Sequence, residues 1–544
     1  MERPYFHYPI MKKAALFFVF SLFLSLPLQS QIDVAWGSPQ IAFPKHSYIT
    51  SILGGNDNYI FALKATPRGW GSQNHFYLDT YARQSMAYVS SKEFQLPQMQ
   101  EMSNVFERLF QGSGKFRSAH IERLFYVNGK FLVFTSYYSS EKQKNFAYFQ
   151  TITENGAKVS PPVKLDSIDT DGKRNKGSFD FALSDDKSHI LIFHNEPFDK
   201  YSNERFSYKV MDENGNILWS KKLELPYPDK QFHVSKYRVD NQGNVFMLAN
   251  IDKDKEHVER RKPTYSYSIL AYFHETDQLK EYIVDLGDKY ISDITFNINP
   301  VGDIVCAGFY SKNSETAQAG TFFLKIDKNT KEVSARNVKE FEKDFLLEFM
   351  SERKIDKGHE LYNFDIGHFL LRADGSAVMV AEQYYMDVVS YYNPATHSYN
   401  YTYNYYYNDI IVVGFDGGGQ ISLLKKIGKY QHSVNDGGPY ASYVLVDGGQ
   451  MLHFLYNDSP DNVRKLESEI EHGHISSMNN PGRSVVVMVS MDMQGHTQRQ
   501  QLLDNHARKN TSWFLPKMNK KISDKDVVLF SRRGKYYRFG RVSL

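Results

Sequence analysis

Residues 371–427 begin with LRADGSAVMVAEQYY, continue through a tyrosine-rich segment and end with NDIIVVGFDGGGQISLLKKI. AVMVA at 377–381 and IIVV at 410–413 are continuous apolar runs. A strand with one wet face alternates apolar and polar residues, so continuous runs indicate strands covered on both faces. Asp-Gly at 374–375 and Asp-Gly-Gly-Gly at 416–419 mark turns. The order of turns and strands is typical of a β-propeller blade, a small sheet sandwiched between its neighbours.

The same turn followed by a buried strand occurs eight times along the chain. The copies are NDNYIFAL from Asn56, VNGKFLVF from Val127, DDKSHILIF from Asp185, DNQGNVFML from Asp240, NPVGDIVCAGF from Asn299, ADGSAVMVA from Ala373, DGGQMLHFL from Asp447 and SDKDVVLF from Ser523. Their spacing suits four short strands with variable loops. We therefore predict an all-β fold with WD40-like repeats, a β-propeller of about eight blades, with seven blades as the alternative.

The last copy leaves no room for an outer strand before the chain ends. Residues 32–43 (IDVAWGSPQIAF) precede the first copy and are predicted to complete the last blade, which would close the ring. Helical spacing of apolar residues also predicts three loop helices, at residues 97–110, 340–353 and 460–472, the last ended by Gly473.

The N-terminus resembles a secretory signal. Met11-Lys12-Lys13 is a short basic region, residues 14–26 are apolar, and Leu28-Gln29-Ser30 is a cleavage motif. We predict a signal peptide at residues 1–30, with Met11 as an alternative start, and a single propeller domain at residues 31–544. An uncleaved anchor is the alternative. No later stretch approaches about 18 apolar residues, so no transmembrane segment is expected after signal cleavage.

Composition argues against several classes of function. The net charge is +3, which does not indicate a nucleic-acid partner. Cys306 is the only cysteine, so an intrachain disulfide is impossible and a buried, inert thiol is expected. The chain has no HExxH, GxSxG or dinucleotide-binding motif.

Three short motifs are too incomplete to predict a bound ion or phosphate. DSIDTDG at 166–172 resembles a calcium loop, but Ser167 and Ser178 occupy the positions that need carboxylates. His472 and His474 form a pair without a third ligand at metal-binding spacing. GSGK at 112–115 lacks the first glycine of a phosphate loop. We therefore predict no metal, no cofactor and no catalytic residue.

The tyrosine-rich segment is the candidate binding site. Its residues are Tyr384, Tyr385, Tyr391, Tyr392, Tyr399, Tyr401, Tyr403, Tyr405 and Tyr407. The last five fall on alternate positions, so one face of a strand would be entirely tyrosine. Such a hairpin could stabilise itself or pack on a neighbouring blade. It could equally form an exposed platform for a glycan, a peptide or a protein.

Three stretches of the chain are distinctive: LRADGSAVMVAEQYY, YNYYYNDIIVVGFDGGGQI and KYQHSVNDGGPYASYVL. They resemble uncharacterised exported β-propeller-like proteins of Bacteroidetes, and the resemblance is closest over residues 362–458. The resemblance implies a propeller-like fold and export in a Gram-negative bacterium, and it assigns no catalytic residue. No sorting domain follows the last repeat, which favours the periplasm over secretion.

Two functions are compatible with the sequence. The first is a non-catalytic module that binds or assembles an envelope protein or glycan. The alternative is a glycan-active enzyme, a hydrolase or a lyase, with carboxylates at the propeller axis. We favour the non-enzymatic function, because no catalytic motif accompanies the aromatic hairpin.

Overall fold

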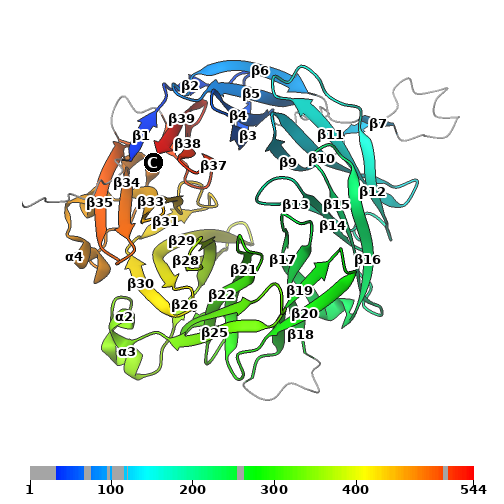
Figure 1. Cartoon of the computed structure of the whole chain (residues 1–544). Helices are drawn as coiled ribbons and strands as arrows, with labels where there is room; N and C mark the ends of the chain where they lie inside the picture. The colour runs from blue at the N-terminus through cyan, green and yellow to red at the C-terminus, as the bar shows by residue number, and fades with distance from the viewer. Residues whose placement is uncertain are drawn as a thin grey trace, which may run out of the picture.

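The computed structural model describes residues 32–66, 75–94, 98–100, 116–118, 120–253, 262–506 and 512–544. Eight antiparallel sheets surround a central channel, as Figure 1 shows, and we number these blades 1 to 8 in chain order. In blades 1 to 7 the chain passes through four strands, and the first strand lies at the axis. The predicted all-β propeller with eight blades is confirmed.

Within each of blades 1 to 4, the four strands are consecutive in the chain. Blade 1 contains β3 (Tyr48–Gly55), β4 (Tyr59–Ala65), β5 (Phe76–Ala82) and β6 (Tyr88–Phe94); blade 2 contains β9 (His120–Val127), β10 (Lys130–Ser139), β11 (Lys144–Thr153) and β12 (Val163–Asp169). Blade 3 contains β13 (Phe179–Leu183), β14 (Ile190–Asn195), β15 (Asn203–Met211) and β16 (Ile217–Pro228); blade 4 contains β17 (Phe232–Val239), β18 (Val245–Asp252), β19 (Tyr265–Phe273) and β20 (Gln278–Val284). A short helix, η1 (Asp229–Gln231), links these last two blades.

Blades 5 to 7 carry the insertions. Blade 5 contains β21 (Tyr290–Ile298), β22 (Ile304–Ser311), β24 (Gly320–Ile326) and β25 (Val333–Glu340); blade 6 contains β27 (Phe364–Leu371), β28 (Ala377–Asn393), β29 (Ser398–Phe415) and β30 (Ile421–Ile427); blade 7 contains β32 (Val444–Asp447), β33 (Met451–Asp458), β34 (Val485–Asp492) and β35 (Thr497–Asp504). The additional strands are β23 (Ala317–Gln318) paired with β26 (Leu361–Tyr362), β31 (Gln431–Val434) beside β29, and β7 (Gln98–Gln100) paired with β8 (Phe116–Ser118). A short helix, η4 (Pro481–Arg483), precedes β34.

Each predicted turn-and-strand copy forms the first turn and the second strand of a blade. These strands are continuously apolar because a neighbouring blade covers each face. Leu248 of blade 4 and Cys306 of blade 5 belong to one cluster, and Val380 of blade 6 packs with Tyr456 of blade 7 in another. Cys306 is fully buried, as predicted, and burial raises the pKa of its thiol.

Blade 8 is built from both ends of the chain, as predicted. It contains β36 (Trp513–Phe514), β37 (Lys520–Ser523), β38 (Asp526–Arg533) and β39 (Tyr536–Ser543), and its outer strands are β1 (Asp33–Trp36) and β2 (Gln40–Ile41). β1 pairs with β39 from Asp33 opposite Ser543 to Trp36 opposite Gly540. The Trp36 ring lies against Gly540 so closely that a Cβ there would stand 2.7 Å from a ring carbon. The same ring meets Phe514 edge-on.

The predicted helices are wrong in length or type. Gln98–Gln100, within the first predicted helix, form strand β7, and most of the remaining helix lies outside the described residues. The second prediction divides into α2 (Lys343–Leu347) and α3 (Glu352–Asp356), and the third into η3 (Pro460–Arg464) and α4 (Glu467–Glu471). Each predicted helix is interrupted by a residue with extended backbone angles, Ser351 in the second and Lys465 in the third.

Residues 1–31, which include the predicted signal peptide, lie outside the described part of the chain. Within the described ranges, no helix has the length and apolar character needed to cross a bilayer.

We expect deletion of residues 32–43 to destabilise the ring, because it removes the outer strands of blade 8 and exposes the edge of β39. The Trp36→Ala substitution alone should lower the free energy of unfolding by about 3 kcal/mol, the usual cost of truncating a packed tryptophan. Thermal unfolding followed by circular dichroism measures both changes. Ser38→Ala, on the exposed link between β1 and β2, is the control. An unchanged melting temperature after the deletion would contradict the closure.

Candidate functional site

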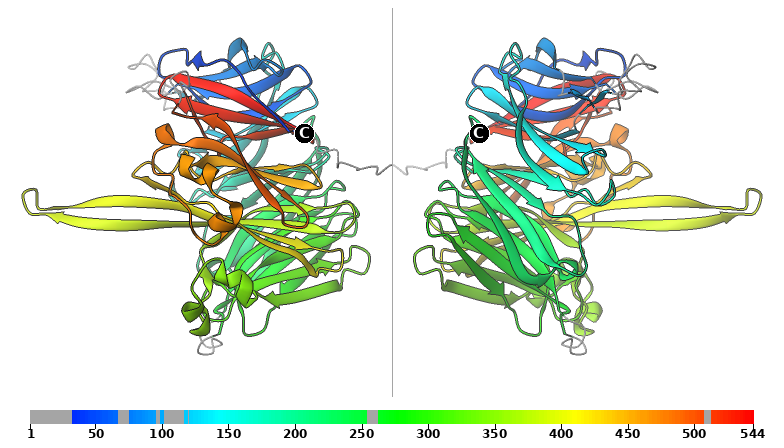
Figure 2. Two further views of the ribbon diagram at one scale, coloured as in Figure 1. Left: turned by 90° about the vertical axis from the view of Figure 1, so that its left-hand side faces the viewer. Right: turned by 90° about the vertical axis from the view of Figure 1, so that its right-hand side faces the viewer.

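Strands β28 and β29 continue beyond the ring as a long two-stranded hairpin, drawn in yellow in Figure 2. Pairing of β27 with β28 ends at Gln383, and pairing of β29 with β30 ends at Ile410. Beyond these positions β28 and β29 pair with each other as far as Asn393 opposite Ser398. The hairpin projects along the ring axis from one face of the propeller and extends farther from the ring than any other strand pair in Figure 2.

The register assigns the predicted tyrosines to two faces of the hairpin. One face carries the opposed pairs Tyr384–Tyr407, Met386–Tyr405, Val388–Tyr403, Ser390–Tyr401 and Tyr392–Tyr399. The other carries Tyr385–Tyr406, Asp387–Asn404, Val389–Thr402 and Tyr391–Asn400. The alternating tyrosines of β29 therefore share one face, as predicted, whereas Tyr385 and Tyr391 lie on the opposite face.

The tyrosines nearest the propeller ring have a structural role. We define the hairpin base as Tyr384, Tyr385, Tyr405, Tyr406 and Tyr407. Within the base, the ring of Tyr384 lies 4.7 Å from that of Tyr407, and the ring of Tyr385 stacks at 4.7 Å on that of Tyr406. β31 pairs with β29 along this segment, and the Lys517 ammonium donates a hydrogen bond of 2.6 Å to the buried Tyr407 hydroxyl. The base is thus a packed extension of blade 6.

The outer part of the hairpin is exposed on both faces. We define the distal hairpin as residues 386–403; it holds the other five predicted tyrosines. Their exposed fractions are 66% for Tyr391, 44% for Tyr392, 60% for Tyr399, 55% for Tyr401 and 39% for Tyr403. Met386, Val388 and Val389 are exposed between them. Asp387 is the only Asp, Glu, Lys or Arg in this segment, so the surface is large, aromatic and almost uncharged.

A buried ion pair fixes the hairpin to the ring. Lys429 is completely buried, and its ammonium lies 2.8 Å from the carboxylate of Glu382, the β28 residue just before the hairpin. The same ammonium donates to the Tyr407 carbonyl at 2.7 Å and to the Gln431 side chain at 3.1 Å. The Ser442 hydroxyl donates to the second Glu382 oxygen at 2.7 Å. Burial lowers the pKa of Lys429, and the charge of Glu382 opposes that shift.

Two further carboxylates lie near Glu382 where blades 5 and 6 meet the axis. Burial and the charges of Asp293 and Glu382 raise the pKa of Asp365 to about 6. Burial also raises the pKa of Asp293, whose carboxylate accepts a hydrogen bond of 2.6 Å from the Ile366 amide. Asp365 and Asp293 therefore hold their protons to a higher pH than ordinary aspartates do, and they adjoin the root of the hairpin.

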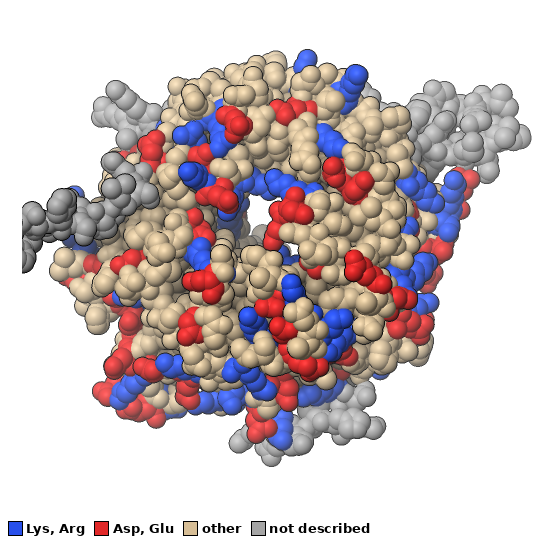
Figure 3. Space-filling model, viewed as in Figure 1, with Lys and Arg blue, Asp and Glu red and all other residues tan. Residues whose placement is uncertain are grey.

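Figure 3 shows the face opposite the hairpin, where both signs of charge surround the mouth of the channel. A cavity of about 870 Å³ there is lined by the first turns of several blades. Two of its carboxylates are already bonded. Asp240 accepts hydrogen bonds from the Gln242 and Asn244 amides of its own turn, and Asp447 pairs with Arg372 at 2.6 Å.

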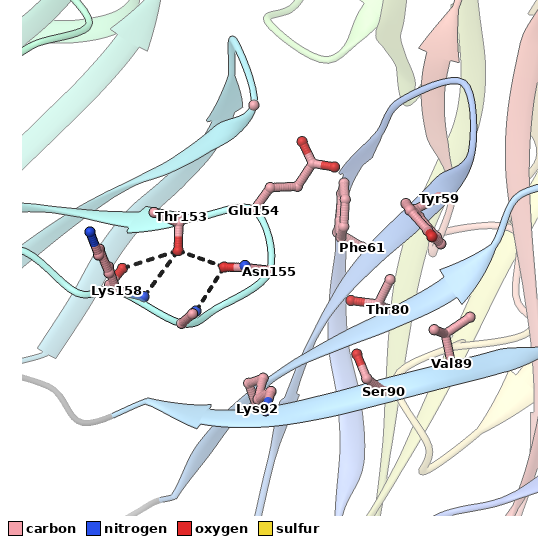
Figure 4. Close-up of a pocket in the computed structure, with 12 residues that line it drawn as sticks. Tyr59, Phe61, Thr80, Val89, Ser90, Lys92, Thr153, Glu154, Asn155 and Lys158 are labelled. Atoms are coloured by element: carbon pink, nitrogen blue, oxygen red, sulfur yellow. Dashed lines mark hydrogen bonds between the residues drawn. The ribbon is translucent and has the colours of Figure 1, made fainter.

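A cleft of about 670 Å³ lies between blades 1 and 2, and Figure 4 shows its lining. Tyr59 and Val89 form its exposed apolar wall on blade 1. The facing turn of blade 2 is closed internally, since the Thr153 hydroxyl donates to Asn155 at 2.8 Å and accepts from the Lys158 amide at 3.0 Å. Glu154 is held by the Tyr126 hydroxyl at 2.9 Å. The polar groups of this cleft thus stabilise the blades themselves.

Two of the three weak sequence motifs have structural roles, and the third, GSGK at 112–115, lies outside the described residues. Asp166 lies in strand β12 rather than in a turn, and its carboxylate is 3.0 Å from the Lys209 ammonium. His472 follows α4, where its ring nitrogen is 2.6 Å from the Ser468 carbonyl. Among the described residues, no group of three or more His, Cys, Asp or Glu is arranged to hold a metal ion.

No family model and no curated protein matches the chain. Among solved structures, it is similar to the WD40 domain of SCAP from fission yeast, at 9% identity and a TM-score of 0.38 over 94% of each chain. It is also similar to the polysaccharide lyase Uly1, at 9% identity and a TM-score of 0.34 over 81% of this chain and 95% of that one. The β-propeller domain of the trilobed protease from Pyrococcus furiosus gives 9% identity and a TM-score of 0.32 over 86% and 98%. Likeness at this level transfers no activity.

We expect Lys429→Met to lower the free energy of unfolding by about 3 kcal/mol, because it leaves Glu382 charged and unpaired in a buried site. Urea denaturation measures this loss. Lys339→Met removes a surface ion pair with Glu342 and should change stability by less than about 1 kcal/mol. Adding Glu382→Gln to Lys429→Met should restore part of the loss. An equal effect of Lys429→Met and Lys339→Met would show that the buried pair contributes nothing.

We expect Asp365 to make the protein less stable as the pH rises from about 4 to about 6. Its folded pKa of about 6 lies above the ordinary value of 3.8, so the folded state holds a proton that the unfolded state has released. Asp365→Asn should therefore raise the free energy of unfolding at pH 8 by about 1 kcal/mol, after allowance for solvent screening, and by little at pH 4. Urea denaturation at both pH values tests this. Asp387→Asn, on the distal hairpin, is the control, and the same gain at both pH values would contradict the assignment.

Proposed function

We propose that this protein is an exported, non-catalytic β-propeller that binds a partner protein or glycan of the bacterial cell envelope through its distal hairpin. The observation that carries the proposal is the exposure of five tyrosines on a nearly uncharged hairpin that projects from the ring. Soluble proteins rarely expose a contiguous aromatic surface of this kind unless it contacts another molecule.

Tyrosine is well suited to such a contact. Its ring supplies apolar area with little loss of side-chain freedom, and its hydroxyl can bond to water or to a partner. The centres of the Tyr392 and Tyr399 side-chain rings lie 5.2 Å apart, and Tyr401 follows on the same face of the hairpin. The side chains are therefore arranged in rows before any partner arrives.

The hairpin base makes the distal hairpin a rigid binding element. A free two-stranded hairpin is only marginally stable in water. Here the Glu382–Lys429 ion pair, the stacked base tyrosines and β31 anchor it to blade 6. A preorganised element loses less conformational entropy on binding, which increases affinity.

Export to the periplasm is part of the same proposal. The basic and apolar residues at positions 11–26 and the cleavage motif at Leu28-Gln29-Ser30 support it. The resemblance to exported Bacteroidetes proteins supports an envelope location. A stable ring without disulfides suits any redox environment.

The geometry supports binding over glycan cleavage. A glycosidase needs two free carboxylates on either side of its substrate. In the axial cavity, Asp240 closes its own turn and Asp447 pairs with Arg372, so Asp185 is the one lining carboxylate that remains.

The test is to replace residues 388–403 by Asn-Gly, which leaves the hairpin base and joins Asp387 to Asn404 through a tight turn. We expect the melting temperature to change by only a few degrees, because the main loss beside the ring is the pair of hydrogen bonds between Tyr403 and Asn435. Capture of envelope partners or glycans should disappear. Pull-down from envelope extract, beside a glycan array, gives the readout.

The matched controls are two triple variants. The variant in which Tyr399, Tyr401 and Tyr403 are all changed to Phe should keep most of the binding. The variant in which the same three residues are changed to Ser should lose it. Retention of binding by the shortened protein would exclude the hairpin as the binding element. Loss of folding would show that the distal hairpin is structural.

A further inference from the structure

The two long edges of the distal hairpin are not equivalent. On the β29 edge, β31 pairs from Asn404 to Tyr407. Asn435 continues this cover, because its amide donates to the Tyr403 carbonyl at 2.9 Å and its side chain accepts from the Tyr403 amide at 2.8 Å. On the β28 edge, the last backbone hydrogen bond from the ring is that of 2.9 Å from the Tyr384 amide to the Asn363 carbonyl. The β28 edge beyond Tyr384 has no strand beside it in the described structure.

The Tyr384 bond fixes which backbone groups point outward. Residues two apart in a strand present their N–H and C=O groups to the same side. Met386, Val388, Ser390 and Tyr392 therefore direct theirs to the open edge. Tyr403 opposes Val388, and its backbone N–H and C=O groups point outward on the other edge, as this alternation requires. Pro394 ends the row at the tip because it has no N–H to donate.

This open edge lacks the features that usually prevent association. Exposed edges in soluble proteins generally carry lysines, prolines or bulges within the strand. Residues 386–392 read MDVVSYY, with one carboxylate and no proline, and their pairing with β29 is regular. Val388, Val389, Tyr391 and Tyr392 are strong strand formers. Such an edge can accept another extended strand by backbone hydrogen bonding.

We propose that the occupant of this edge is the same edge of a second copy of the chain, paired antiparallel about a twofold axis at Val389. The inference rests on the proposed role of the distal hairpin as a binding element and names its partner. Antiparallel pairing centred on Val389 is the single register in which all four outward-pointing residues face one another. Met386 then pairs with Tyr392 of the second copy and Val388 with Ser390, which gives eight backbone hydrogen bonds across the axis.

Charge and side-chain positions fit this register. Asp387 of each copy lies opposite Tyr391 of the other, and the two Asp387 residues stand about 13 Å apart along the strands, beyond the screening length at physiological salt. A twofold axis perpendicular to the sheet keeps both tyrosine-lined faces on the same side. The dimer therefore holds a four-stranded sheet with one continuous aromatic face, whereas each hairpin alone has two strands.

The size of the interface predicts reversible association. Seven paired residues span about 23 Å, and an edge contact of this length belongs to the weak class of interfaces below about 1,200 Å². We expect monomers at low concentration and dimers at high concentration, with the rings at opposite ends of the shared sheet.

Cysteine cross-linking of the full mature chain tests the register. In the proposed dimer the two Val389 residues form a non-hydrogen-bonded pair with Cα atoms about 4.5 Å apart, within disulfide range. Val389→Cys should give a covalent dimer when oxidised with diamide. Thr402→Cys, directly opposite on β29, is the matched control and should stay monomeric. The native Cys306 is fully buried and does not interfere.

Sedimentation velocity over a concentration series tests the edge without cross-linking. Ser390→Pro removes an outward N–H and should abolish the dimer, while Ser390→Ala keeps the amide and should retain it. Unchanged thermal unfolding shows that each variant is folded.

The inference is overturned if the unmodified protein stays monomeric at every concentration, or if Val389→Cys and Thr402→Cys cross-link equally. A monomer that still loses partner capture when residues 388–403 are replaced would refute self-association and leave the proposed function standing. A dimer that survives Ser390→Pro would place the contact elsewhere.

Discussion

Burial of both faces of every blade is the constraint on which this structure depends. A small sheet with two apolar faces is stable only if a neighbour covers each one, so each blade requires the next and the series must close on itself. Interface clusters such as Phe309 with Met379, between blades 5 and 6, supply this cover around the ring. Because the blades protect one another, the fold needs no disulfide, and its single thiol is one more apolar group in the core.

The same constraint determines where variation is tolerated. Strands inside a blade cannot lengthen without exposing apolar surface, but a connection at the end of a blade can. The connection between β28 and β29 has lengthened into a hairpin, and the polar contacts of Lys429 and Glu382 join it to the ring. A binding surface can thus be added without disturbing the packing of the blades.

Much of this architecture could be predicted from the sequence, because its signals are local. Continuous apolar runs after short polar turns located the second strand of every blade, and residues 32–43 were identifiable as the missing outer strand. Alternation of tyrosines predicted the face shared by Tyr399, Tyr401 and Tyr403. Each of these signals depends on residues close together in the chain.

Features that depend on distant contacts could not be predicted. Lys429 lies in the sequence KKIGKYQ, which resembles a solvent-exposed lysine-rich segment, and only the packing of blades 6 and 7 buries it. The division between packed and exposed tyrosines follows from β31 and Lys517, which arrive from elsewhere in the chain. The loop helices were predicted too long because periodicity does not show where a blade surface bends.

The pairing of Asp33 with Ser543 also affects how the protein reaches its native state. β1 and β39 share one sheet, so blade 8 cannot be completed until β39 has emerged from the ribosome. Contacts between such distant segments form slowly, since the entropy of closing a long loop must be lost first.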